Sequence, residues 1–285
     1  MSYVNIVFIL WRELFEAILI VTIAQAFLAR QANSPQTAKR LMWAGVGAGC
    51  FLSLLLGVTF QLIQDQLSGN ALDYFQTGVL VVCAGLMTHM CLWMKRHSRS
   101  LKSELETSMG QALTATNQVL VAVLMALAIA REGFEMVVYL FGMGVGLGGS
   151  GQFSYLALAA VVTLSFILAA LSSWALSRGL RVIRPATFFR VTGAFLLLTA
   201  SCMLVTATSR LLQVGALPSL IDQVWDSSWL LDDRSAVGQV VSGMTGYQAT
   251  PALVTVIIYG TYWVAYFFGS ASSRLAAPVR RENHA

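Results

Sequence analysis

Residues 4–29 decide the fold: they read VNIVFILWRELFEAILIVTIAQAFLA, an almost unbroken apolar run. At about 1.5 Å per residue, a helix of this length is long enough to cross a hydrocarbon core of about 30 Å. The run nevertheless contains three charged residues, Arg12, Glu13 and Glu16. It therefore predicts a transmembrane helix that carries charge inside the membrane.

The composition of the whole chain agrees with this prediction. Of its 285 residues, 57% are hydrophobic and only 11% are charged, less than half of the roughly 25% found in soluble domains. These are too few charged residues to cover the surface of a soluble protein. A transmembrane barrel would need short alternating segments, and this chain has long apolar runs instead. The sequence thus predicts an all-α, polytopic membrane protein.

Seven apolar segments are long enough to cross a membrane, and they span residues 4–29, 40–63, 72–94, 113–147, 153–177, 187–213 and 250–269. We expect them to form one transmembrane domain over residues 1–285. Its expected parts are a first three-helix repeat over about 1–95, a cytoplasmic connection over 95–112, a second repeat over 113–213, an external segment over 214–249, a last helix over 250–269 and a cytoplasmic tail over 270–285.

The basic residues orient these predicted helices. With seven spans, 14 of the 18 Lys and Arg residues fall on one side of the membrane, in three connections and the C-terminal tail. Basic residues mark the cytoplasmic side, so the N-terminus is expected outside and the C-terminus in the cytoplasm. The net charge of +5 is therefore interpreted as a topology signal, and no nucleic-acid partner is expected.

The charged cluster of the first segment recurs in the fourth. Residues 11–17 read WRELFEA and residues 130–136 read AREGFEM, so both contain Arg-Glu-x-x-Glu with Phe before the second Glu. Three predicted helices separate one copy from the next, and the two copies therefore enter the membrane in opposite directions. This is the arrangement of an inverted repeat, with helices 1–3 matching helices 4–6 and a seventh helix added.

Helical geometry places the charges of each copy on one face, because the Arg and the second Glu are four residues apart and the two Glu are three apart. Two such helices facing each other would bring together Glu13, Glu16, Glu132, Glu135, Arg12 and Arg131. Their net charge near −2 and their oxygen ligands favour a hard cation. Inserting six charges costs about 15–20 kcal/mol before pairing. A purely structural pair of Arg–Glu bridges would leave one Glu of each copy unexplained.

These motifs make the chain similar to the high-affinity iron permease family. That family includes fungal permeases that work with a multicopper ferroxidase and bacterial permeases of oxidase- or peroxidase-linked iron uptake. Residues 225–233, which read WDSSWLLDD, and the following Gly246-Tyr247 and Pro251 also resemble the family. One position departs from it: the family motif has Gly after the first Glu, which Gly133 matches and Leu14 does not.

The resemblance implies an iron uptake permease of a bacterial inner membrane, not an enzyme. It implies that four glutamates bind Fe²⁺ or Fe³⁺ during passage and that two arginines support them; these are Glu13, Glu16, Glu132 and Glu135, with Arg12 and Arg131. Iron is then the transported substrate, and no tightly bound cofactor is expected. The resemblance also implies an oxidising partner outside the cytoplasm, namely a ferroxidase, a cupredoxin or a haem peroxidase.

Other candidate residues are less specific. His89 lies in the third segment near Met87, Met90 and Met94 and is a candidate for the ion path, although methionine also fills gaps between packed helices. Four external aspartates are candidates for raising the local concentration of cations, and these are Asp222, Asp226, Asp232 and Asp233.

Two other functions fit the same residues. A proton-coupled carrier of a small solute would use the glutamates as proton relays. An intramembrane diiron oxidoreductase would use them as iron ligands, but such sites usually add Glu-x-x-His pairs. The chain has Glu-x-x-Glu instead, and His89 is its one histidine within a predicted span.

Overall fold

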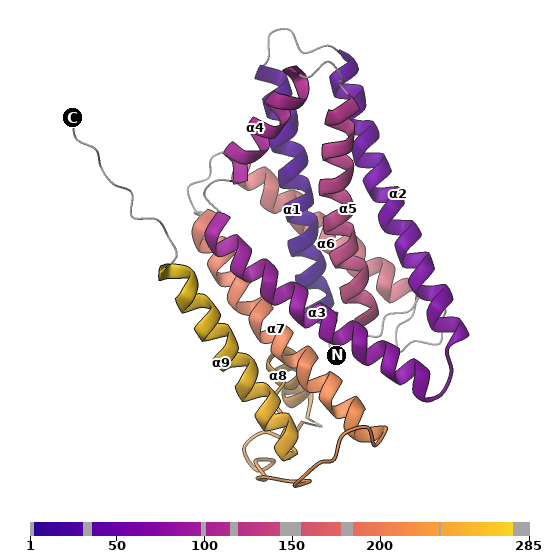
Figure 1. Ribbon diagram of the computed structural model, residues 1–285, viewed down its shortest axis with the longest axis vertical. Helices are drawn as coiled ribbons and strands as arrows, with labels where there is room; N and C mark the ends of the chain where they lie inside the picture. The colour runs from indigo at the N-terminus through magenta and orange to yellow at the C-terminus, as the bar shows by residue number, and fades with distance from the viewer. Residues whose placement is uncertain are drawn as a thin grey trace, which may run out of the picture.

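The computed structural model describes residues 3–30, 36–97, 101–114, 119–142, 155–177, 185–233 and 235–275. Within these ranges the chain forms nine helices and no strand (Figure 1), which confirms the all-α prediction. The helices are α1 (Tyr3–Arg30), α2 (Gln36–Gln66), α3 (Asn70–His97), α4 (Leu101–Thr114), α5 (Val119–Gly142), α6 (Tyr155–Ser177), α7 (Pro185–Gln213), α8 (Ala236–Thr245) and α9 (Leu253–Leu275).

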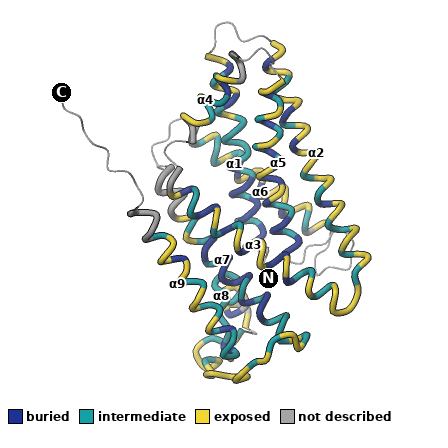
Figure 2. The backbone as a smooth tube through the Cα atoms, viewed as in Figure 1, coloured by how far each residue is buried: buried dark blue, intermediate teal, exposed yellow. Residues whose placement is uncertain are grey.

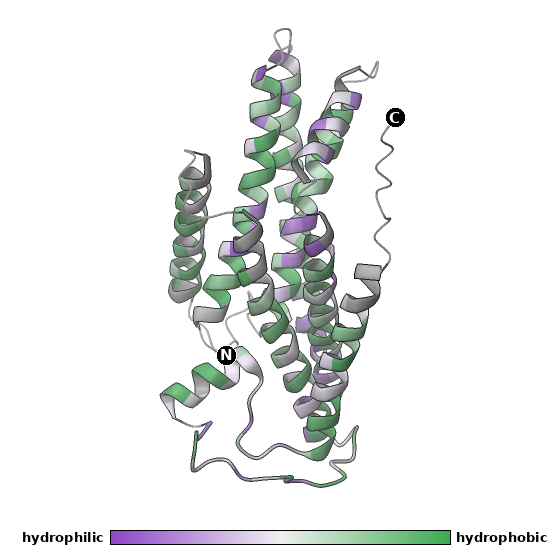
Figure 3. Cartoon of the chain, turned by 90° about the vertical axis from the view of Figure 1, so that its left-hand side faces the viewer, coloured by the Kyte–Doolittle hydropathy of each residue, from purple (hydrophilic) through white to green (hydrophobic). Residues whose placement is uncertain are grey.

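Five stretches of the described chain are long and apolar enough to cross a membrane, and they lie in α2, α3, α6, α7 and α9. Lipid offers the backbone no hydrogen-bond partners, so apolar segments of this length satisfy their amides internally as helices. The two remaining long helices, α1 and α5, carry the three charged residues of one motif copy each. Figure 3 shows apolar residues along most of the length of the long helices. Seven spans therefore remain a prediction, with five supported by length and composition.

Three helix pairs make the most extensive contacts: α2 with α5, α3 with α7, and α1 with α6. The motif helices α1 and α5 also contact each other, and α3 packs against α5. The largest apolar core lies where these helices meet, and it includes Ile9, Leu80, Met87, Tyr139 and Leu196. Figure 2 shows buried residues gathered there, whereas α2 is exposed along much of its length.

Small residues on α2 allow α5 to approach closely. A Cβ atom added at Gly49 would lie 2.8 Å from both the carbonyl oxygen of Ala126 and the Cβ of Ile129. One turn earlier, a Cβ at Gly45 would collide with the carbonyl oxygen of Ala122. The GxxxG pattern of Gly45 and Gly49 is therefore a helix-packing surface, and it fixes the height of α5 against α2.

Two buried cysteines fix the position of α3. Cys83 donates through Sγ to the carbonyl oxygen of Val138 on α5 at 3.1 Å. Cys91 donates to the carbonyl oxygen of Gly193 on α7 at 3.2 Å. Both thiols are free, so the cysteines join helices as weak hydrogen-bond donors. Together they hold α3 in register between the two neighbouring helices.

The connection after α3 and the segment after α7 both contain helices of their own. α4 lies within the predicted cytoplasmic connection and packs against α1 and α5. α8 lies within the predicted external segment; Ser235 caps its start, and Gly246 ends it with φ 75°. Gly246 also sits against α7, where an added Cβ would lie 3.0 Å from the Cα of Cys202. Several basic residues used to predict the topology lie outside the described chain, and these are Arg99, Arg178, Arg181, Arg184, Arg234, Arg280 and Arg281.

Candidate metal site

The first motif copy is buried as a tight cluster on α1. The two terminal nitrogens of Arg12 contact Glu13 Oε1 at 2.6 Å and Glu16 Oε1 at 2.7 Å. The side chain of Arg12 is only 2% exposed and that of Glu13 is fully buried. One guanidinium group therefore compensates both carboxylates of its own copy.

The second copy, on α5, is arranged differently. Arg131 contacts Glu135 through Nε at 3.3 Å, and its Nη2 donates to the sulfur of Met90 on α3 at 3.1 Å. Its guanidinium carbon lies 4.9 Å from the centre of the Trp93 ring. The side chain of Arg131 is 42% exposed, whereas Glu132 beside it is 3% exposed. No ion pair of Glu132 is found among the described residues.

The structure brings the four motif glutamates together in the interior between α1 and α5. Glu13 interacts electrostatically with Glu16 and Glu135, and its carboxyl group lies within hydrogen-bonding reach of that of Glu132 on the other motif helix. The Oε2 atoms of Glu13 and Glu132 are buried and have no hydrogen-bond partner. A buried carboxylate oxygen without a hydrogen-bond donor is costly. Glu16 Oε1 on α1 is in the same situation, because it lies close to Arg12 without hydrogen-bond geometry. In the described part of the chain, no three His, Cys, Asp or Glu side chains are arranged to hold a metal ion as they stand.

Three residues outside the two motif copies also contact the charged cluster, namely Tyr139, Met90 and Trp93. Tyr139 donates its hydroxyl hydrogen to Glu135 Oε2 at 3.2 Å, and it lies four residues after Glu135, on the same helix face. The spacing of four residues between Glu135 and Tyr139 in the sequence already indicates that the two side chains can meet on one helix face. Met90 and Trp93 belong to α3, and nothing in the local sequence links either of them to Arg131. They could be found only once the packing of α3 against α5 was known.

His89 does not join the cluster. Its side chain is exposed, whereas Met87, Met90 and Met94 on the same helix are buried. The thioether of Met90 does reach the site, but it accepts a hydrogen bond from Arg131. The histidine and the methionines of this stretch therefore point to different sides of α3.

The four aspartates of the predicted external segment lie apart from the buried cluster. Asp233 Oδ1 accepts a hydrogen bond from the backbone N–H of Ala249 at 2.8 Å, so this residue ties the segment after α7 to the start of α9. Asp226 accepts from the hydroxyl and the backbone N–H of Ser228 at 2.6 and 2.9 Å. These two hydrogen bonds hold the pKa of Asp226 below its usual value. Asp222 and Asp232 are exposed.

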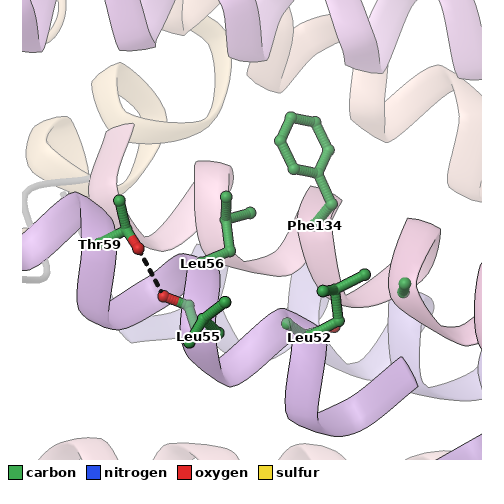
Figure 4. Close-up of a pocket in the computed structure, with 7 residues that line it drawn as sticks. Leu52, Leu55, Leu56, Thr59 and Phe134 are labelled. Carbon is green, nitrogen blue, oxygen red and sulfur yellow. Dashed lines mark hydrogen bonds between the residues drawn. The ribbon is translucent and has the colours of Figure 1, made fainter. Parts of the chain in front are cut away.

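An apolar pocket of about 210 Å³ lies between α2 and α5. Figure 4 shows Leu52, Leu55, Leu56 and Thr59 of α2 with Phe134 of α5 around it. No charged residue lines this pocket, and Leu52 and Leu55 are themselves exposed. The pocket therefore has the character of a surface that faces lipid and does not form part of an ion path.

Several apolar helices around a buried acidic cluster define a multi-pass membrane transporter. Comparison with known proteins identifies the group: residues 3–271 match the iron permease FTR1 family. The chain belongs to this family, which agrees with the family resemblance of the motifs. It is thus a transporter of the iron permease type and not an enzyme.

Several bacterial proteins are similar along most of their length. The ferrous iron permease EfeU of Yersinia pestis is 28% identical over 262 residues, an alignment that covers 90% of this chain and 89% of that protein. The ferrous iron permease EfeU of Escherichia coli O6:H1 is 29% identical over 261 residues, covering 90% and 91% of the two chains. No solved structure matches this chain.

Proposed function

We propose that this protein takes up ferrous iron across a bacterial inner membrane through the carboxylate cluster between α1 and α5. The observation that carries the proposal is the meeting of two buried carboxyl groups, one from each motif helix: Glu13 and Glu132 lie within hydrogen-bonding reach of each other, and the Oε2 atom of each receives no hydrogen bond from another side chain. Carboxylate oxygens suit iron in both oxidation states and favour the harder Fe³⁺. The ferrous substrate is taken from the names of the similar bacterial proteins.

Iron binding in this proposal requires the carboxylates to move, because Arg12 occupies the first copy. Four glutamates and two arginines give a formal charge of −2, so one divalent ion neutralises the cluster. In this proposal the arriving iron replaces Arg12 as the partner of a carboxylate of Glu13 or Glu16. The positive charge of the ion then compensates the buried carboxylate that Arg12 no longer contacts.

The pattern of helix contacts supports an inverted repeat. In an inverted repeat, α1, α2 and α3 of the first repeat correspond to α5, α6 and α7 of the second. The contact of α1 with α6 then corresponds to that of α5 with α2. The contact of α3 with α5 corresponds to that of α7 with α1. All four pairs are in contact. In this proposal the chain has seven spans, its N-terminus is outside and its C-terminus is cytoplasmic. Transporters of this kind move one repeat against the other around a central site.

We further propose that an extracytoplasmic partner oxidises the incoming iron, as the family resemblance implies. The partner would be a ferroxidase, a cupredoxin or a haem peroxidase. The exposed Asp222 and Asp226 on the external segment would collect cations near the outer surface, because clustered negative charge raises the local cation concentration.

The proposal is tested by uptake of radioactive iron into proteoliposomes. Fe²⁺ kept reduced by ascorbate and Fe³⁺ as a weak chelate are offered in parallel. We expect uptake by the wild type and its loss in Glu13→Gln and in Glu132→Gln. Glu104→Gln, a glutamate-to-glutamine change on the exposed surface of α4, is the matched control and should leave uptake unchanged.

The same preparation separates the other functions. Transport by Glu13→Gln at the wild-type rate would contradict the assigned site. Uptake of a small solute that dissipates a pH gradient without metal would indicate a proton-coupled carrier. Two iron ions held tightly by the purified protein would indicate a diiron oxidoreductase. If neither oxidation state of iron enters, adding the candidate oxidising partner distinguishes an obligatory partner from a wrong substrate.

A further inference from the structure

Arg131 has different neighbours from Arg12. Arg12 directs both terminal nitrogens at carboxylates of its own helix. Arg131 reaches Glu135 only through Nε, at 3.3 Å. One of its terminal nitrogens instead donates to the sulfur of Met90, and its guanidinium plane lies by the ring of Trp93. Much of what holds Arg131 therefore belongs to α3.

Each of these two contacts with α3 is weaker than an ion pair with Glu132, which Arg131 does not form. A thioether is a weak acceptor, and a cation over an aromatic ring is a moderate attraction. A carboxylate is a stronger partner for a guanidinium group, and Glu132 is the next residue in the chain. Its Oε2 is nevertheless buried and receives no hydrogen bond from a cation, and its carboxyl group faces that of Glu13 instead. The position of Arg131 is thus explained by two α3 side chains acting together.

α3 is well placed to impose that position. Cys83 fixes it against α5 through the carbonyl oxygen of Val138, and Cys91 fixes it against α7 through Gly193. Met90 is 1% exposed and lies next to Cys91. The sulfur and the indole ring are therefore held at a set height beside the second motif, and Arg131 extends to meet them.

We propose that Met90 and Trp93 are positioning residues, which hold Arg131 away from Glu132 and so keep a carboxylate of the second motif open to the cation. The identity of that cation as iron rests on the proposed function, but the position of Arg131 does not. Without the two α3 side chains, Arg131 turns to Glu132, and the second motif becomes closed as the first one is.

The first test measures the state of Glu132 without any transport. An apolar carbodiimide adds to buried carboxyl groups that no cation engages, and mass spectrometry of fragmented peptides locates the adduct. In the double variant Met90→Leu/Trp93→Leu, we expect labelling of Glu132 to fall about fivefold, the factor that an ordinary cation–π attraction supplies. The single variant Trp93→Phe retains an aromatic ring beside Arg131 and keeps Met90. Its Glu132 should therefore be labelled almost as strongly as that of the wild type.

Controls separate positioning from packing. Met87→Leu changes a buried methionine on the same helix, and Trp43→Leu changes an exposed tryptophan on α2; neither should alter the labelling. In an Arg131→Gln background the Met90 and Trp93 changes should have no effect, because no guanidinium remains to be redirected. Size-exclusion profiles and thermal midpoints establish that each variant is folded.

The second test uses iron uptake by the same variants. We expect KM to rise about fivefold in Met90→Leu/Trp93→Leu with little change in maximal rate, because a closed carboxylate weakens capture of the ion. Unchanged labelling of Glu132 in the folded double variant would overturn the proposal, as would the same loss of labelling in the Arg131→Gln background. If the wild type takes up no iron even with the candidate oxidising partner added, the proposed function fails, while the labelling result still decides the role of α3.

Discussion

Arg12 and Arg131 occupy the same place in two copies of one motif, and their surroundings differ. Arg12 is enclosed and contacts both glutamates of its copy at 2.6 and 2.7 Å. Arg131 is 42% exposed and contacts one glutamate at 3.3 Å. Because the charged residues and their spacing are the same in the two copies, the difference between the arginines is attributed to the helices that pack against each copy. The motif provides the charged residues, and contacts with the neighbouring helix determine which carboxylate is not paired with an arginine.

The largest expected effect follows from burial. Arg12→Gln leaves two buried carboxylates without their cation, and breaking a buried pair in this way costs roughly 3–5 kcal/mol. We expect little folded protein, measured as the yield of monodisperse material in detergent and as the thermal midpoint. Arg131→Gln leaves one buried carboxylate, Glu135, without its cation and should cost less than Arg12→Gln, because only one carboxylate is affected and Arg131 itself is 42% exposed. Equal losses in the two variants would contradict the difference in burial between the two copies.

The next effect concerns the position that differs in sequence between the copies. An added Cβ at Gly133 would collide with the side chain of Ser53 on α2, so Gly133→Leu should lower stability by about 1–3 kcal/mol through overpacking. Leu14→Gly in the first copy adds no atoms and should cost about 1 kcal/mol through helix propensity. Thermal midpoints in detergent compare the two.

A companion experiment sharpens this prediction. Ser53→Gly should restore much of the stability lost in Gly133→Ala, because it removes the side chain that meets the new methyl group. If Ser53→Gly and Gly133→Ala instead destabilise additively, the two residues do not share a contact.

A smaller effect is expected from the tyrosine that donates a hydrogen bond to the second copy. Tyr139→Phe removes the hydroxyl that donates to Glu135 Oε2 at 3.2 Å, and loss of one such hydrogen bond costs about 0.5–1.5 kcal/mol. The matching position in α1 is Ile20, which has no hydroxyl. Tyr262→Phe removes a hydroxyl paired with Thr88 on α3 and is the control. Only the Tyr139 variant should change the KM for iron, measured by uptake in proteoliposomes.

The smallest effect is expected outside the membrane. Asp226→Asn should reduce the initial rate of uptake about twofold at low ionic strength and hardly at all in high salt, because exposed charges act over a distance that salt shortens. The hydrogen bonds from Ser228 keep the pKa of Asp226 below its usual value. Asp226 therefore stays ionised as the pH falls through the range in which an ordinary Asp near 3.9 begins to protonate. Ser228→Ala should move the loss of this contribution to higher pH.

The long apolar runs and the repeated motif were enough to predict an all-α membrane protein and its family. The sequence also contains a GxxxG pattern at Gly45 and Gly49, which is weak by itself; that α5 packs on it is shown only by the structure. The contacts of Arg131 could not be predicted in this way. They depend on the rotation and height of α3, which are set by contacts with α5 and α7 far apart in sequence. The exposure of His89 depends on the same rotation.

The local pairing of Arg12 bears on how the chain is made. α1 leaves the ribosome long before α5 and α6, the helices that later bury it. During that interval its charges have no partner on another helix, and an isolated charge in a bilayer costs several kcal/mol. The charge of Arg12 is compensated within its own helix, since both of its carboxylate partners lie within four residues. In the proposed seven-span topology, the first copy is thus suited to early membrane insertion, whereas α5 would enter a bilayer that already holds α1 and α3, and Arg131 could there contact side chains of α3.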